Sequence, residues 1–188
     1  MSKVKAVLII GGSGFIGTHL AMKLRDAHKV FATYHTNRIA IPGVSCIPFN
    51  TENRDYIKRV AYTLRPDVVI FASGNHDLAW SEHNRRDAER IHAGGAANIA
   101  SAFDILQPRF IYISSCYSFD GSKGNYHEND SVLPSSALGK AKLGAENLVR
   151  GKSLNYMIVR SSPVLGRGNG LNLSFLDQIG RASCRERV

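Results

Sequence analysis

Three glycines spaced three residues apart form a candidate phosphate-binding turn. Gly11, Gly14 and Gly17 follow an apolar run and precede a helical pattern, which gives the motif G-x-x-G-x-x-G. Glycines at this spacing permit a tight turn and let the backbone approach a pyrophosphate, and the N-terminus of the following helix attracts phosphates. The segment therefore predicts a dinucleotide site; the alternative is a glycine-rich turn without a ligand. The cofactor-binding residues predicted here are Gly11, Gly14, Phe15, Ile16 and Gly17.

The end of the second predicted strand indicates which dinucleotide is bound. An NAD site usually has an acidic residue at this place, which holds the ribose 2′-hydroxyl. The chain instead continues from Tyr34 to Arg38 without a carboxylate. Because the guanidinium of Arg38 can pair with a 2′-phosphate, the sequence favours NADP, with NAD as the second candidate. The other interpretation of Arg38 is a solvated turn residue.

A second candidate segment follows the fourth predicted strand. It contains Ala72, Ser73 and Gly74, and His76 lies two residues further on. In open parallel sheets, ligands bind at the carboxyl ends of the strands. We therefore expect the first three residues to contact the cofactor, and His76 is a candidate contact to cofactor or substrate. The seven histidines lack the spacing of metal ligands, so no metal site is predicted.

The elements that must position these residues alternate along the chain. Apolar runs predict strands at 4–10, 30–34, 45–49, 68–72, 110–114 and 156–160. Apolar periodicity and the lengths of the segments between the strands predict helices at 16–28, 54–64, 85–106 and 139–149. Such alternation is typical of a parallel sheet with helices on both faces. The sequence therefore predicts an α/β fold, a doubly wound Rossmann-type domain over residues 1–170, with residues 171–178 starting a further domain.

Composition narrows the class of protein. Of 188 residues, 44% are hydrophobic and 21% are charged, which is typical of a globular domain. No apolar run approaches the roughly 18 residues of a membrane helix, and three distant cysteines offer no disulfide framework. We therefore expect a cytoplasmic protein without a membrane partner. The net charge is +9, but the basic residues are scattered, which argues against nucleic acid as a partner.

The last ten residues, 179–188, differ from the rest of the chain because they show no apolar periodicity. Their sequence, IGRASCRERV, back-translates into codons that match a common short-read sequencing adapter read in frame. We therefore interpret residues 179–188 as a non-native tail that follows a truncated gene. Without its three Arg and one Glu, the net charge falls from +9 to +7.

Longer motifs resemble the extended short-chain dehydrogenase/reductases, the NAD-dependent epimerase/dehydratase superfamily. Within them they are most similar to the dTDP-4-dehydrorhamnose reductase group. Residues 114–121, SSCYSFDG, are similar to the group's S-T-D-Y-V-F-D-G, and residues 91–100 are similar to its V-N-A-x-G-A-x-N-L-A, with His92 in place of Asn. Further matches are Tyr126, Glu128, Asp130, Pro134, Gly139, Lys142, Glu146 and Arg160. The resemblance runs from about Lys5 to Gly168. It implies hydride transfer between a nicotinamide cofactor and a keto-sugar nucleotide.

The resemblance also implies a catalytic group in which a tyrosine gives a proton, a lysine four residues later assists it, and a Ser or Thr hydroxyl holds the oxygen. Ser115 and Lys142 match the hydroxyl and the lysine, and Lys142 is also expected to hold the cofactor ribose. The tyrosine position is Leu138, which has no proton to give. Tyr117 or Tyr126 in the preceding loop is an alternative proton donor, but a structural role is favoured for both, because the family has tyrosines there beside the catalytic one.

Three functions are compatible with these residues. The first is an NAD(P)H-dependent reductase of a sugar nucleotide, or a related epimerase or dehydratase. The second, favoured by Leu138, is a non-catalytic NADP-binding subunit with a regulatory or sensing role, and the third is a nucleic-acid-binding surface. The family's substrate domain, built largely from its C-terminal third, is mostly missing. We therefore expect this fragment to bind cofactor without turning over a sugar nucleotide; a nucleotide-sugar substrate and a homodimer are expectations for the full-length parent.

Overall fold

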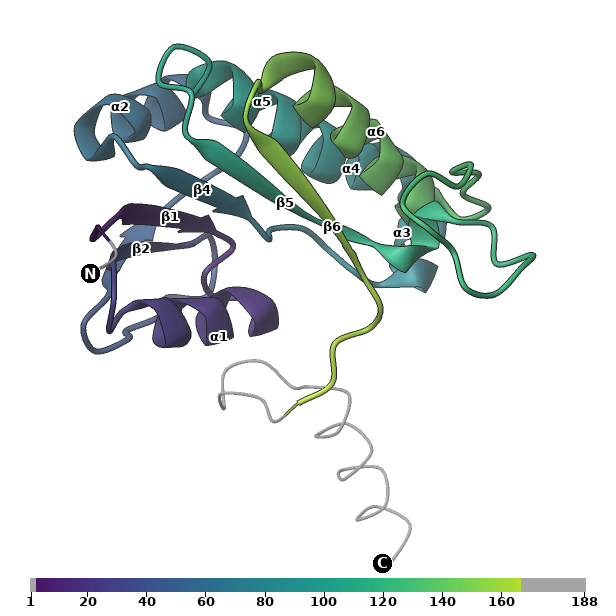
Figure 1. Cartoon of the computed structure of the whole chain (residues 1–188), viewed down its shortest axis with the longest axis horizontal. Helices are drawn as coiled ribbons and strands as arrows, with labels where there is room; N and C mark the ends of the chain where they lie inside the picture. Colours follow the sequence, from purple (N-terminus) through teal and green to yellow (C-terminus); the bar gives the residue numbers. More distant parts are fainter. Residues whose placement is uncertain (1–2, 167–188) are drawn as a thin grey trace, which may run out of the picture.

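Six parallel strands form one sheet in the order β3-β2-β1-β4-β5-β6 (Figure 1). The strands are β1 (Ala6–Ile10), β2 (Lys29–Tyr34), β3 (Ser45–Pro48), β4 (Val68–Phe71), β5 (Arg109–Ser115) and β6 (Tyr156–Ser161). The computed structural model describes residues 3–166. The expected domain start at 171–178 and the expected non-native tail at 179–188 therefore lie outside the described residues.

Helices cover both faces of the sheet, as a doubly wound fold requires (Figure 1). They are α1 (Phe15–Leu24), α2 (Arg54–Leu64), α3 (Leu78–His83), α4 (Arg85–Glu89), α5 (Gly95–Ala102) and α6 (Ala137–Lys152). Helix α1 lies on one face, and α2, α5 and α6 lie on the other. A π-helical turn, η1 (Arg90–Gly94), joins α4 to α5, and a short 3-10 turn, η2 (Cys116–Ser118), follows β5. The predicted fold class is confirmed.

Strand β1 is buried on both of its faces, which explains its continuously apolar sequence. Val7 and Ile9 pack in the core beneath α1, whereas Leu8 and Ile10 pack in the core beneath α2 and α5. All four side chains are buried, because a central parallel strand has helices on both sides. No helix within residues 3–166 has the length and apolar composition needed to cross a membrane.

The connections reverse direction between β1 and β4, since β2 and β3 extend the sheet to one side and β4 to β6 extend it to the other. At such a switch point the loops after the two strands diverge and leave a crevice for a ligand. Here the loops also touch: a Cβ on Gly11 would lie 2.7 Å from the carbonyl oxygen of Ala72 and 2.7 Å from the amide nitrogen of Ser73. The backbone of Gly11, with φ +88°, also favours glycine. The predicted glycine turn and the segment after β4 therefore meet at this switch point.

A buried carboxylate fixes α6 against the two strands beside it. Glu146 on α6 is fully buried and accepts a hydrogen bond from Ser114 Oγ at 2.6 Å. Its other partners are the guanidinium groups of Arg160, at 2.7 Å, and Arg150, at 3.2 Å. Burial raises the pKa of Glu146, but hydrogen bonds from Arg160 and Ser114 outweigh that effect, so the pKa lies below its ordinary value of 4.5. Helix α6 is thus tied to the carboxyl ends of β5 and β6.

Glu146→Gln is expected to lower the free energy of unfolding by about 3–5 kcal/mol at pH 7, because it leaves the largely buried Arg160 without its counter-charge. Urea denaturation measures this loss. The folded pKa is lower than the unfolded one, so the carboxylate stabilises the fold above about pH 4.5 and loses this effect as the pH falls further. The difference between wild type and variant should therefore shrink in acid.

Glu89→Gln, at an exposed position on α4, is the matched control and should change stability by less than about 0.5 kcal/mol. If Glu146→Gln behaved like this control, the buried network would not hold α6 in place.

Candidate functional site

The first turn of α1 is suited to an anion. Within the described chain, α2, α3 and α6 begin with side-chain caps from Asn53, Asp77 and Ser136, whereas α1 begins at Gly14 without one. The first turn of α1 also contains no acidic residue. Its amide groups and the positive end of the helix dipole therefore remain available to a negatively charged ligand.

Close backbone packing explains the glycines of this turn. A Cβ on Gly17 would collide with the carbonyl oxygen of Gly11, and a Cβ on Gly14 would lie 3.2 Å from the same oxygen. Two threonines hold the turn: Thr33 Oγ1 accepts from Gly11 N at 3.1 Å, and Thr18 Oγ1 donates to a turn carbonyl at 2.9 Å. The turn is therefore rigid and free of bulky side chains, so it fits a pyrophosphate. Phe15 and Ile16 form the first helical positions beside it.

Arg38 lies beyond the end of β2 and is exposed. It borders a cavity of about 420 Å³ together with Tyr34, the last residue of that strand. Among residues 3–166, no acceptor or carboxylate is paired with its guanidinium group. Arg38 is therefore free to meet a phosphate beside the carboxyl end of β2.

A second cavity, of about 180 Å³, lies at the carboxyl ends of β5 and β6. Three predicted positions, Ile16, Ser115 and Leu138, meet here, together with His76 from the loop after β4. The other lining residues are Ile113, Ser114, Tyr117, Ser161, Ser162, Pro163 and Val164. Sequence reasoning missed the contribution of residues 161–164; the available signal was a run of small polar residues directly after a predicted strand. We call this space the strand-end cavity.

Leu138 and Lys142 lie one turn apart on the buried side of α6, with exposed fractions of 1% and 0%. Leu138 lines the strand-end cavity, whereas Lys142 does not. The Lys142 Nζ instead donates to the carbonyl oxygen of Ile113 at 3.1 Å and lies 5.4 Å from the centroid of the Tyr112 ring. The leucine therefore stands where a tyrosine was expected, and the lysine behind it bonds to the protein itself.

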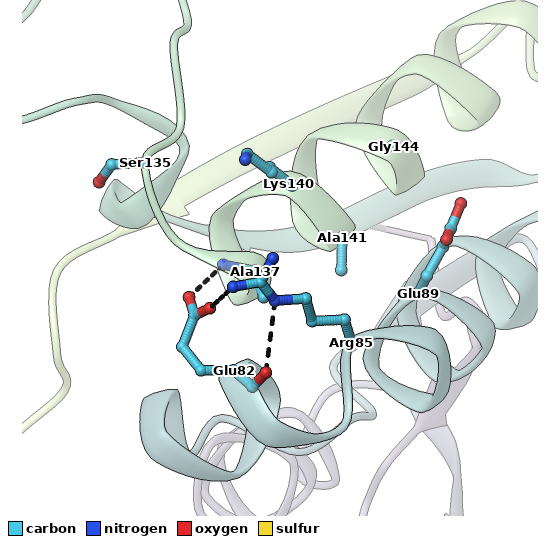
Figure 2. A pocket seen from close by; sticks show the side chains of 8 residues that line it. All are labelled: Glu82, Arg85, Glu89, Ser135, Ala137, Lys140, Ala141 and Gly144. Carbon is cyan, nitrogen blue, oxygen red and sulfur yellow. Dashed lines mark hydrogen bonds and ion pairs between the residues drawn. The ribbon is translucent and has the colours of Figure 1, made fainter.

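The start of α6 is held from α3 (Figure 2). The Glu82 carboxylate accepts a hydrogen bond from Ala137 N at 2.6 Å and pairs with Arg85 at 2.9 Å. These residues line a cavity of about 240 Å³ that contains none of the predicted site residues. Its role in the site is indirect, because it fixes the helical turn that carries Leu138.

Two buried bases lie close to each other behind the strand-end cavity. Burial lowers the pKa of Lys142 from 10.5 to about 7, although the Glu146 carboxylate opposes this shift. Burial, followed by the positive charge of Lys142, lowers the pKa of His92 to about 3. The Nε2 of His92 donates to the carbonyl oxygen of Asn75 at 2.8 Å, and Nδ1 has no partner among the described residues. His92 is therefore neutral near pH 7.

The segment after β4 lies between the glycine turn and His92. Ala72 and Ser73 contact Gly11 through their backbones, as described above. Gly74 has a φ of +136°, and a Cβ there would collide with the His92 ring. The three predicted cofactor contacts after β4 thus lie against the glycine turn and His92, and they do not line the strand-end cavity.

Lys142→Met is expected to raise the free energy of unfolding at pH 7 by about 2–4 kcal/mol, because it removes the cost of burying an ammonium group. The native pKa is the lower one, so the unfolded chain binds the extra proton between about pH 7 and 10.5 and wild-type stability rises across that range. The gain from methionine should therefore be largest below pH 7 and shrink toward pH 10.

The matched control is Lys140→Met, two residues away on the exposed side of α6, for which a change within about 0.5 kcal/mol is expected. Denaturation at several pH values distinguishes the two variants. A destabilised Lys142→Met protein at neutral pH would contradict this description of the lysine.

Comparison with known proteins shows which family the chain resembles in sequence. The chain matches the family model described as RmlD substrate binding domain over residues 5–183. It is 29% identical over 171 residues to the probable low-salt glycan biosynthesis reductase Agl14 of Haloferax volcanii, covering 88% of this chain and 56% of that protein. It is also 26% identical over 163 residues to methionine adenosyltransferase 2 subunit beta of Bos taurus, covering 86% and 47%.

Among solved structures, the chain is similar to dTDP-4-dehydrorhamnose reductase (rfbD) from Bacillus anthracis in complex with NADP. The TM-score is 0.84 at 23% identity, and the match covers 100% of this chain and 62% of that one. This likeness concerns the fold. The chain spans about half the length of the curated relatives that it matches.

Proposed function

Because the chain belongs to the RmlD substrate binding domain family, we propose that it binds NADP(H) and serves the reduction of a keto-sugar nucleotide by hydride transfer. One observation carries this proposal. Ile16 in the uncapped first turn of α1 and Ser115 at the end of β5 line the same strand-end cavity, which supports a phosphate site adjacent to a reaction site. A bound NADPH would supply the hydride for the reaction.

The residues that would hold the cofactor follow from their positions. The glycine turn would bind the pyrophosphate through backbone amides at the start of α1. Arg38, unpaired in the described chain, would bind the 2′-phosphate of NADP(H). NAD, which lacks this phosphate, is the second candidate. The similar Bacillus anthracis structure contains NADP, which supports the same cofactor here.

Ser115 would hold the substrate oxygen. It ends β5, lines the strand-end cavity, and its Oγ accepts a hydrogen bond from Tyr117 N at 3.3 Å. The hydroxyl hydrogen of Ser115 can therefore point toward a carbonyl oxygen in the cavity, where a fixed donor stabilises developing negative charge. The tyrosine that the family places beside it is absent, so the proton must come from another group.

The cofactor domain proposed here covers residues 1–170, and the activity, substrate and partners of the whole protein are part of the proposal. We propose a cytoplasmic location, because the widely spaced cysteines of the sequence offer no disulfide framework. Within the full-length parent, a homodimer remains an expectation from the family. The fragment alone is expected to bind cofactor without turnover.

A non-catalytic NADP-binding subunit is the second candidate function. Leu138 favours it, because this side chain has no proton to give, and Lys142 is turned into the protein interior. The similarity to methionine adenosyltransferase 2 subunit beta, which is named as a subunit, is compatible with it. Cofactor binding is common to both candidates, so turnover must distinguish them.

Fluorescence titration of this chain should show tighter binding of NADPH than of NADH. Arg38→Ala should weaken NADPH binding about 10-fold to 100-fold, because it removes a charge-assisted hydrogen bond to the 2′-phosphate. Binding of NADH should change little. Arg86→Ala, an exposed arginine on α4, is the control and should leave both affinities as they are. Equal effects of Arg38→Ala on both cofactors would contradict the assignment of the 2′-phosphate.

Restoring the missing hydroxyl tests whether the full-length protein is a reductase. We expect wild-type protein to oxidise NADPH with dTDP-4-dehydrorhamnose as substrate, and Leu138→Tyr to increase this rate, because a tyrosine there lies one helical turn from Lys142. Leu138→Phe, which adds the ring without the hydroxyl, is the control. Turnover that occurs only in Leu138→Tyr would instead identify a binding subunit that lacks the chemistry.

A further inference from the structure

The strand-end cavity contains another candidate for the missing proton-transfer group. This inference rests on the proposed function. We propose that the imidazole of His76 exchanges a proton with the substrate oxygen, in place of the tyrosine hydroxyl that is missing at Leu138. His92, beneath it, acts as its positioning residue. The first observation is that His76 and Ser115 line the same cavity.

Few groups that line this cavity can exchange a proton. Leu138 has none to give, and Lys142 is fully buried and does not reach the cavity. Serine hydroxyls donate hydrogen bonds but are too weakly acidic to act alone as general acids. His76 and Tyr117 therefore remain as candidates among the described residues.

Chemistry favours His76 over Tyr117. A neutral imidazole has one nitrogen that donates a proton and one that accepts it, so the same ring can exchange a proton in either direction of the reaction. A phenol usually needs a neighbouring cation to act at neutral pH. The lysine that would assist it donates instead to Ile113. His76 lines the cavity and keeps part of its surface open to solvent while its ring packs against its neighbours, so water can restore its proton after each transfer.

The backbone around His76 is fixed on both sides. Gly74 turns the chain with a φ of +136°, and its missing side chain leaves room for the His92 ring. His92 Nε2 then donates to the carbonyl oxygen of Asn75 at 2.8 Å, while the Asn75 side chain accepts from Asp77 N at 2.9 Å. The rings of His76 and His92 lie with centroids 5.8 Å apart. His76 thus rests on a ring that is itself hydrogen-bonded to the loop.

His92 has features of a residue kept for function. It lies in η1, the π-helical turn between α4 and α5, and such turns occur frequently at functional sites. It is fully buried, yet its Nδ1 has no partner among residues 3–166. An unpaired buried nitrogen costs stability, whereas an apolar side chain would pack there without that cost. This cost is consistent with a positioning role for the ring.

The proton balance fits either direction of the reaction. During reduction, the imidazolium N–H bond of His76 breaks and its proton joins the carbonyl oxygen, while a bound NADPH would supply the hydride to the carbonyl carbon. The C=O group becomes an alcohol, and the neutral imidazole recovers a proton from water. In the reverse direction, the neutral imidazole accepts the hydroxyl proton of the substrate.

The groups that face His76 determine how this depends on pH. They are the Lys142 amine from α6, the His92 ring from η1, and the Ser115 and Tyr117 side chains after β5. Packing of the ring against its neighbours, followed by the charge of Lys142, lowers the pKa of His76 to about 4. Its neutral form therefore predominates at pH 7, and reduction should slow as the pH rises.

Histidine side-chain NMR of this chain tests the location of the ring without turnover. The nicotinamide ring is positively charged in NADP⁺ and neutral in NADPH, so an imidazole beside it should show different nitrogen shifts in the two complexes. We expect this difference at His76, assigned from its disappearance in His76→Gln. The distant His28, His83 and His127 should not distinguish the two forms. His92→Phe, which keeps a ring but loses the bond to Asn75, should reduce the difference.

Two results separate the possible failures of this test. If both cofactors bind but His76 has the same shifts in both, the inference is wrong and the proposed cofactor site stands. If neither cofactor binds, the proposed function fails and the inference fails with it.

Turnover of dTDP-4-dehydrorhamnose by the full-length protein tests the proton transfer itself. His76→Gln should lower kcat at least 100-fold with a small change in the KM for NADPH, and should remove the decline of kcat with rising pH. Adding Leu138→Tyr to His76→Gln should raise kcat at least tenfold above that of His76→Gln. Tyr117→Phe alone should retain most of the wild-type kcat. A kcat within threefold of wild type in His76→Gln would overturn the proposal.

Discussion

Glu146 lies fully buried on α6, where its carboxylate accepts hydrogen bonds from Ser114 in β5 and Arg160 in β6. A charge in the interior is tolerated only when hydrogen bonds and a counter-charge replace the lost water, and both are present here. The geometry of the candidate site depends on this arrangement. It holds the helix that carries Leu138 and Lys142 in register with the strand end that carries Ser115.

The candidate site has two halves: the cofactor half matches the sequence pattern of the family, and the reaction half departs from it at Leu138. The cofactor half combines a glycine turn, an uncapped helix and an unpaired arginine, which suit pyrophosphate and 2′-phosphate groups. In the reaction half, a leucine replaces a proton donor, and Lys142 bonds to Ile113. Burial lowers the pKa of this amine, and its hydrogen-bond partner is a backbone carbonyl. The part of the chain with the glycine turn thus keeps groups suited to phosphates, whereas the part around Leu138 lacks the phenol that the family pattern leads one to expect.

Most helices and strands could be predicted from the sequence, because buried elements have a recognisable local pattern of apolar residues. All six strands were predicted, since parallel strands with helices on both faces need continuous apolar runs. The helix Leu78–His83 was missed because six residues are too few to show periodicity, and its start depends on the Asp77 cap. The π-helical turn Arg90–Gly94 was also missed, because a shift in backbone hydrogen bonding leaves no mark on hydrophobic spacing.

The sequence by itself determined the glycine turn, the strand–helix alternation, the arginine after the second strand and the absence of a tyrosine at Leu138. These are properties of residue type and short spacing. Only the tertiary structure decided that the ring centroids of His76 and His92, 16 residues apart in the chain, lie 5.8 Å from each other, and that Lys142 does not line the strand-end cavity. The physical reason is that contact and burial depend on how distant elements pack, and local spacing does not specify that packing.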